Sequence, residues 1–208
     1  MSKWLIAASF AGGLAAAAGG WALWPAAPPQ RSANELMHVL MWDREPVGGP
    51  FALIDHDGRP RTDADFRGRL MLIYFGFTFC SNICPTDLQA IAGALDQLGP
   101  AGDAVQPLFI TVDPEKDTPA QLKSHVGLFH PRMIGLTGSR KQIREVAADY
   151  KVYYAKAEPS KRTDPEIDHS GFTFLVGRDG KYLGFFPPGT PADRMAATIR
   201  PHLAAPQS

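Results

Sequence analysis

Residues 70–85 read LMLIYFGFTFCSNICP, and this stretch decides the fold. Residues 70–77 form a continuous apolar run, which predicts a strand buried on both faces of a sheet. Pro85 suits the first turn of a helix. Apolar residues then recur at helical spacing, namely Leu88, Ile91, Ala92, Leu95 and Leu98. We therefore expect a buried strand that leads through a turn with two cysteines into an amphipathic helix.

The rest of the chain alternates the same two patterns. Short β-rich runs predict strands at residues 107–112, 152–156, 173–176 and 182–186, the last two joined by a turn at residues 178–180. Helical spacing predicts three more helices, around Leu122, Val126 and Phe129, around Ile143, Val146, Ala147 and Tyr150, and around Met195, Ile199 and Leu203. Residues 155–168 hold few apolar side chains and predict an exposed loop. This order predicts an α/β fold over residues 49–204, with a central mixed sheet flanked by helices, of the thioredoxin-like kind.

Residues 1–24 differ from everything that follows them. No charge occurs from residue 4 to residue 24, and tryptophans lie near both ends, as in a helix that spans a bilayer. Lys3 favours an N-inside orientation, and residues 25–48 form a proline-rich linker and juxtamembrane segment. A cleaved signal peptide is the alternative, since residues 15–18 are small. We prefer an uncleaved anchor in a bacterial inner membrane, with the soluble domain in the periplasm, where thiols can be oxidised.

Composition excludes two classes of function. The 21 Lys and Arg residues balance 21 Asp and Glu residues and form no basic run, so nucleic-acid binding is not expected. Cys80 and Cys84 are the only cysteines, so the chain is no disulfide scaffold and cannot build a zinc site from four thiolates. The two cysteines must therefore act as one local device.

Cys80 and Cys84 lie at the start of the predicted helix. The helix dipole there favours a thiolate, so we expect a lowered thiol pKa and reactivity toward disulfides or metals. The alternatives are two inert buried thiols or a structural disulfide, which would close a short loop and stabilise the fold by only about 2 kcal/mol. Three residues separate the cysteines, one more than in a thioredoxin-type redox pair, which leaves room for a metal ion. Two thiolates favour Cu(I), or Zn(II) if harder ligands join them.

A third ligand would distinguish a metal site from a simple dithiol, and His169 is the candidate. A lone histidine in a loop is usually only solvated. In a thioredoxin-like sheet, however, the loop before the strand at residues 173–176 returns beside the cysteine-bearing helix. This topology predicts that the His169 imidazole comes close to both sulfurs.

Four separated motifs carry a resemblance: residues 74–86 (YFGFTFCSNICPT), 110–119 (ITVDPEKDTP), 135–138 (GLTG) and 168–170 (DHS). In this order they resemble the Sco/SenC family of membrane-anchored copper chaperones, from about residue 49 to the last helix. The resemblance implies a thioredoxin-like fold that binds copper, as Cu(I) or Cu(II), through Cys80, Cys84 and His169. It also implies delivery of that copper to the binuclear copper centre of cytochrome c oxidase.

Carboxylates near the predicted site are candidates for a supporting role. Asp113 and Asp117 follow the strand at residues 107–112, at the sheet edge where such folds place their sites, and Asp168 precedes His169. A carboxylate of this kind can fix the tautomer of a metal-bound imidazole. For Asp117, capping of the helix that begins just after it is an equal alternative.

Other potential ligands receive simpler interpretations. A juxtamembrane apolar turn is preferred over a soft-metal entry patch for Met37, His38 and Met41. The remaining histidines show no ligand spacing and are expected to face solvent, namely His56, His125, His130 and His202.

Three functions remain for the cysteine pair. The first is a copper chaperone that is not an enzyme, served by an upstream periplasmic copper donor or thiol reductant, with the copper-bearing oxidase subunit as acceptor. The second is a thiol–disulfide oxidoreductase that reduces the acceptor's cysteines, in which Cys80 attacks and Cys84 resolves without need of His169. The third, peroxidase chemistry, ranks last because no arginine lies close in sequence to either cysteine.

Overall fold

The structure is a computed structural model that describes residues 46–80, 83–156 and 167–204. The expected anchor at residues 1–24, most of the linker and the residues Met37, His38 and Met41 lie outside this range. Within the described residues, no helix has both the length and the apolar character needed to cross a bilayer. The anchor therefore stays a prediction from the sequence.

Two sheets are built from nine strands in the described part of the chain. The seven-stranded sheet has the order β2-β1-β5-β4-β3-β8-β9, and β6 pairs with β7 in a small sheet of their own. The strands are β1 (Ala52–Asp55), β2 (Pro60–Thr62), β3 (Leu70–Gly76), β4 (Val105–Thr111), β5 (Ile134–Thr137), β6 (Tyr154–Lys156), β7 (Ile167–His169), β8 (Thr173–Val176) and β9 (Tyr182–Phe186).

The sheet is mixed and β3 lies inside it. β3 runs parallel to β4 and antiparallel to β8, while β4 and β5 are parallel. Every residue of β3 and of β4 is buried, which explains the continuous apolar run in the sequence. The carboxyl ends of β3 and β4 therefore meet at one edge of the sheet.

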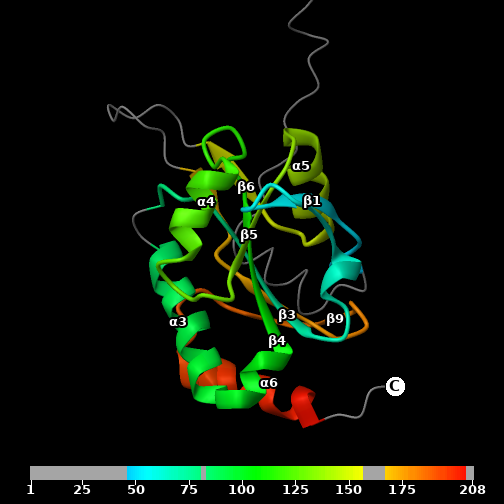
Figure 1. Ribbon diagram of the computed structural model, residues 1–208, viewed down its shortest axis with the longest axis vertical. Coiled ribbons are helices and arrows are strands. Elements are labelled where there is room, and N and C mark those ends of the chain that lie inside the picture. Colours follow the sequence, from blue (N-terminus) through cyan, green and yellow to red (C-terminus); the bar gives the residue numbers. More distant parts are fainter. Residues whose placement is uncertain (1–45, 81–82, 157–166, 205–208) are drawn as a thin grey trace, which may run out of the picture. The chain divides into compact units, whose positions relative to one another are not determined.

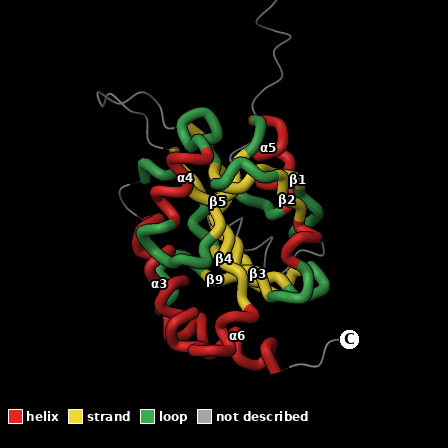
Figure 2. Tube along the Cα trace, in the orientation of Figure 1, coloured by secondary structure: helices red, strands yellow, loops and turns green. Residues whose placement is uncertain are grey.

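Helices cover both faces of this sheet (Figure 1). α3 (Ile83–Leu98), α4 (Pro119–Val126) and α6 (Ala192–Ala204) pack on one face, and α5 (Arg140–Asp149) packs on the other. Of two short 3-10 helices, η1 (Asp63–Phe66) connects β2 to β3, and η2 (Gly99–Ala104) connects α3 to β4. Figure 2 shows the strands enclosed between these helices. This architecture confirms the predicted α/β class with a mixed sheet of the thioredoxin-like kind.

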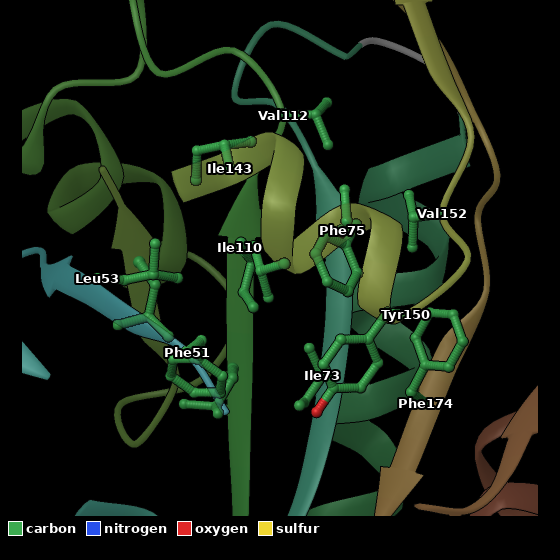
Figure 3. Packing of buried hydrophobic residues seen from close by; sticks show 14 of the residues in the cluster. Phe51, Leu53, Ile73, Phe75, Ile110, Val112, Ile143, Tyr150, Val152 and Phe174 are labelled. Atoms are coloured by element: carbon green, nitrogen blue, oxygen red, sulfur yellow. The ribbon is translucent and has the colours of Figure 1, made fainter. Parts of the chain in front are cut away.

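Alternate residues of β3 supply two separate hydrophobic cores. Ile73 and Phe75 point toward α5, where Tyr150 and Phe174 pack against them (Figure 3). The ring centroids of Phe75 and Tyr150 lie 5.5 Å apart. Leu72 and Tyr74 belong to the other core, with residues of α3 and α6. Because side chains alternate along a strand, one run of sequence fills both layers.

The structure adds strands that the sequence analysis did not predict. β5 and the β1–β2 hairpin are short, and they lack a long apolar run. The expected loop at residues 155–168 is wrong at both ends, because β6 and β7 pair in register, with Tyr154 opposite His169. His169 is therefore held on a strand.

Candidate metal site

Three potential metal ligands meet at the carboxyl end of β3. Donor atoms of Cys80, Cys84 and His169 all lie within 4.8 Å of one another. His169 Nε2 is 3.1 Å from Cys84 Sγ and 3.9 Å from Cys80 Sγ. The two cysteines are not joined by a disulfide. The structure thus brings together the three residues that the sequence singled out from positions up to 89 apart.

Gly76 makes room for the sulfur of Cys84 at the end of β3. A Cβ atom at this position would lie 2.9 Å from Cys84 Sγ, 3.0 Å from Tyr74 Cε1 and 3.1 Å from Phe109 Cε2. Real Cβ atoms essentially never approach another atom as closely as 2.9 Å, and the other two contacts are tighter than most. The strand backbone can therefore lie directly against the sulfur only because residue 76 has no side chain.

Cys84 lies inside the first turn of α3 and is completely buried. Its hydrogen bond with Cys80, its burial and the charge of Cys80 together raise the pKa of the Cys84 thiol, against weaker opposing hydrogen bonds from the Phe77 backbone and Tyr74. The expectation of a lowered pKa at the helix N-terminus is therefore wrong for Cys84. The hydrogen bond with Cys80 and the withdrawal from water raise it instead.

Cys80 lies at the end of a tight turn that follows β3. Its backbone N–H donates to the Phe77 carbonyl at 3.2 Å, which closes the turn over Thr78 and Phe79. Cys80 is only partly buried, whereas Cys84 is enclosed. Phe79 beside it is exposed, with the Lys116 ammonium 5.8 Å from its ring centroid. Cys80 is therefore the sulfur that a second molecule can approach.

Two aromatic rings hold the imidazole of His169. Tyr74 and Phe77 meet it edge to face, with ring centroids 6.2 Å and 5.8 Å away. These contacts and the pairing of β7 with β6 direct Nε2 toward the sulfurs. His169 Nδ1 is buried and has no hydrogen-bond partner among the described residues. No carboxylate in the described part of the chain thus fixes the tautomer, contrary to the role expected of Asp113 or Asp117, and the Asp168 side chain lies outside that part.

Tyr74 and Asp87 are site residues that the sequence analysis missed. The Tyr74 hydroxyl donates to Asp87 Oδ2 at 3.3 Å and lies within hydrogen-bonding reach of the Cys84 sulfur. Asp87 Oδ1 also accepts the backbone N–H of Gly189 at 2.8 Å. Burial raises the pKa of the Asp87 carboxyl despite these bonds. An available signal was the position of this acid on the apolar face of α3, between Cys84 and Leu88.

Asp113 and Asp117 lie in the loop after β4, at the expected edge of the sheet. Both are buried. Thr118, and not Asp117, caps α4, because its hydroxyl accepts the backbone N–H of Gln121 at 3.3 Å. The capping alternative for Asp117 is therefore wrong. Its carboxylate instead binds Thr78 and Thr111.

The expectation that the other histidines face solvent is wrong for His125. Its ring packs against Phe109 and Phe129, with centroids 5.3 Å and 5.2 Å away. Burial lowers the pKa of this imidazole. His56 and His130 are half-buried and accept backbone N–H groups through Nδ1. None of these three joins the donor cluster.

The donor set fits a soft, low-coordinate metal ion. Two thiolate sulfurs select Cu(I) most strongly, and an imidazole nitrogen suits copper in either oxidation state. Among the His, Cys, Asp and Glu side chains of the described residues, those of Cys80, Cys84 and His169 lie close enough together to share a metal ion. The same two thiols also suit a dithiol redox pair, so the third donor decides between the two chemistries.

Comparison with known proteins gives a consistent result. The family model described as SCO1/SenC matches residues 41–204. The protein named SCO2 homolog, mitochondrial, from Bos taurus is 44% identical over 159 residues, which cover 76% of this chain and 60% of the relative. The chain thus spans less than two thirds of that relative's length.

Solved structures extend the likeness to the fold. Copper-bound ScoI from Arabidopsis thaliana matches with a TM-score of 0.71 and 39% identity, covering 76% of this chain and 98% of the other. BsSco, described as a Sco-family cytochrome c oxidase assembly protein with a disulfide switch, matches with a TM-score of 0.59 and 27% identity. That match covers 78% of this chain and 98% of the other.

Proposed function

The chain belongs to the SCO1/SenC family, and from this premise we propose that it binds one copper ion and passes it to the binuclear copper centre of cytochrome c oxidase. The ligands are Cys80 Sγ, Cys84 Sγ and His169 Nε2. The observation that carries the proposal is the meeting of these three donors within 4.8 Å of one another. Copper-bound structures of similar proteins support the choice of metal.

The exposure of the donors suits transfer rather than permanent storage. Cys84 is enclosed, while Cys80 and His169 are only partly buried. Three donors satisfy Cu(I), and the partly open side leaves an approach for the thiolates of an acceptor. Copper then moves by ligand exchange, in which an acceptor sulfur binds the copper ion before Cys80 Sγ dissociates from it.

Loading requires the reduced cysteines. Both thiols must lose their protons to bind copper, so binding releases protons and weakens at low pH. The raised pKa of Cys84 strengthens this dependence, because copper must displace a proton that the buried thiol holds firmly. The disulfide form of the protein carries no metal.

The proposal includes the expected setting. Residues 1–24 anchor the protein in a bacterial inner membrane and residues 49–204 face the periplasm. The acceptor is the copper-bearing subunit of the oxidase, and an upstream periplasmic donor or reductant supplies copper or electrons. The relation of BsSco to cytochrome c oxidase assembly supports this choice of partner.

A second candidate is thiol–disulfide exchange with the acceptor's cysteines, favoured by the hydrogen bond between the two sulfurs. The Cys80 thiolate would attack the acceptor disulfide and release one acceptor thiol. Cys84 would then displace the second thiol and leave a Cys80–Cys84 disulfide, so that two electrons pass to the acceptor. The disulfide switch of BsSco is in keeping with this role. It needs no imidazole.

An anaerobic Cu(I) titration against a competing chelator tests the proposal. We expect the reduced protein to bind one copper ion, the Cys84→Ser variant to lose tight binding, and His169→Ala to bind at least tenfold more weakly. His56→Ala is the matched control, because His56 is also half-buried and hydrogen-bonded but lies near β5, away from the sulfurs.

Two results would contradict the chaperone function. One is wild-type protein that binds no copper tightly. The other is His169→Ala protein that binds copper as well as wild type and His56→Ala do. Either result would leave thiol–disulfide exchange as the function of the cysteine pair.

A further inference from the structure

Asp117 is a buried acid that the proposed function does not use. It is completely inaccessible to solvent. Its Oδ2 accepts the backbone N–H of Thr78 at 3.0 Å and the hydroxyl of Thr111 at 2.6 Å, and its Oδ1 accepts the hydroxyl of Thr78 at 2.6 Å. No salt bridge to it occurs in the described part of the chain. An unpaired buried carboxylate is costly, so three hydrogen bonds must offset its desolvation.

These bonds join two loops at the site. Thr111 ends β4 and Asp117 lies just before α4, whereas Thr78 belongs to the turn that carries Cys80. Asp117 is bonded to both polar groups of Thr78 that face it. These hydrogen bonds therefore hold the turn against the loop between β4 and α4, at a residue two positions before Cys80.

The two cysteines are held in different ways. Cys84 is fixed by the hydrogen bonds of α3 and by the close packing of Gly76, Tyr74 and Phe109 around its sulfur. Cys80 precedes the helix, and its backbone N–H bonds back to Phe77 within the turn. The position of Cys80 therefore depends on how firmly that turn is held.

We propose that Asp117 is a positioning residue for the metal site, which acts through Thr78 to keep the Cys80 sulfur beside Cys84 and His169. The inference rests on the proposed copper function. Asp117 is not one of the metal ligands, and it is not the N-cap of α4, because Thr118 occupies that position. Charge-assisted hydrogen bonds to its carboxylate are stronger than neutral ones, which suits a fastening role.

The expected loss of copper affinity is taken from residues that orient metal ligands in other proteins. Loss of such a residue typically weakens metal binding 10- to 100-fold. We expect Asp117→Ala to lower Cu(I) affinity at least tenfold. Asp117→Asn should stay within about threefold of wild type. Its amide oxygen can accept the Thr78 and Thr111 bonds at the Oδ2 position, and its NH2 group can donate to the Thr78 hydroxyl oxygen.

A double-mutant cycle on the purified full-length protein tests the route through Cys80. Asp117→Ala is combined with Cys80→Ser and, separately, with Cys84→Ser, and Cu(I) affinity is measured against chelators of graded strength. If Asp117 acts through Cys80, its loss weakens binding in the Cys84→Ser background but not further in the Cys80→Ser background.

Asp55→Ala is the matched control for general destabilisation. Asp55 is also buried and also accepts three hydrogen bonds, from the backbone N–H groups of Asp57 and Arg59 and from Arg61 Nε, but it lies in β1. It should leave copper affinity unchanged. Thr78→Val removes one bond to Asp117 with little change of shape and serves if Asp117→Ala folds poorly. Thr78→Ser keeps the hydroxyl and should bind copper as wild type does.

Several results would overturn the inference. One is an unchanged Cu(I) affinity in both Asp117→Ala and Thr78→Val, and another is a loss of affinity from Asp117→Ala that is as large in the Cys80→Ser background as in the Cys84→Ser background. The others are an Asp55→Ala variant that loses as much affinity as Asp117→Ala, and an Asp117→Asn variant that binds copper as weakly as Asp117→Ala. Wild-type protein that binds no copper in the same titration would refute the proposed function and the inference with it. A copper-binding wild type with an inert Asp117 would refute the inference alone.

Discussion

Replacement of Gly76 by alanine tests whether the end of β3 is fitted to the sulfur of Cys84. The new methyl group would lie 2.9 Å from Cys84 Sγ, 3.0 Å from the Tyr74 ring and 3.1 Å from the Phe109 ring. All three side chains are completely buried, so none can swing into solvent. The strand or the sulfur must therefore move.

The expected cost can be worked from these contacts. Overpacking of a filled core costs about 1–3 kcal/mol. Removal of a glycine also restricts the unfolded chain, which stabilises the protein by about 0.4–1 kcal/mol. The midpoints of these two ranges leave a net loss of about 1.3 kcal/mol, which is close to a tenfold change in the unfolding equilibrium. Displacement of the sulfur should also weaken Cu(I) binding.

Denaturant unfolding of the metal-free protein measures the loss, with Gly184→Ala as the control. Gly184 is also a strand residue, but nothing lies within 4 Å of a Cβ placed there. Gly184→Ala should be neutral or slightly stabilising. A Gly76→Ala protein as stable as Gly184→Ala, with unchanged copper affinity, would refute the reasoning.

Three further predictions concern buried polar groups. Burial lowers the pKa of His125 below its ordinary value of 6.5, so the unfolded chain takes up the proton first. Stability should therefore be full above pH 6.5 and fall below it, and His125→Phe should reduce that slope in unfolding experiments at pH 7.5 and 5.5, leaving the part due to His130, whose pKa burial also lowers. A slope equal to that of wild type would contradict this assignment. Burial alone would raise the pKa of Asp55, but hydrogen bonds, among them one from Arg61, hold it below 3.8. The stability that the Asp55 carboxylate contributes should be complete above pH 3.8 and be lost as the pH falls through its pKa in the folded protein. Asp55→Asn should therefore make stability less dependent on pH in that acid range. Acid unfolding identical to wild type would argue against it. Tyr74→Phe removes a donor to the buried Asp87 and should cost about 1–3 kcal/mol of stability, and unchanged unfolding would show that the 3.3 Å bond contributes little.

Long periodic segments of this fold were predictable from the sequence. The apolar run of β3, the helical spacing in α3 and the β-rich runs of β8 and β9 all have patterns that favour the element observed. β5 was missed because four residues that include a glycine carry no period. The pairing of β6 with β7 was missed because it depends on tertiary context.

The donor residues were predictable, but most of their supports were not, and Asp117 was a candidate only for fixing the imidazole tautomer or capping a helix. Cys80, Cys84 and His169 are chemically distinctive, and the topology alone brings them to one sheet edge. The roles of Gly76 and Asp117 depend on distances of about 3 Å between atoms of the folded chain, which no spacing rule contains. The thiol pKa of Cys84 was misjudged because the helix position was visible in the sequence, while the hydrogen bond with Cys80 and the burial were not.

The small β6–β7 sheet gives metal loading a second consequence. Cys84 belongs to α3, which packs on the large sheet, and His169 belongs to the small sheet, 85 positions later. A copper ion bound by both Cys84 and His169 would cross-link the helix to the small sheet and close the chain between them into a loop. Ligands that bind only folded protein stabilise it by about 2.7 kcal/mol at 100 times the dissociation constant. Copper supply would then set how long each molecule resists proteolysis as well as whether it carries cargo.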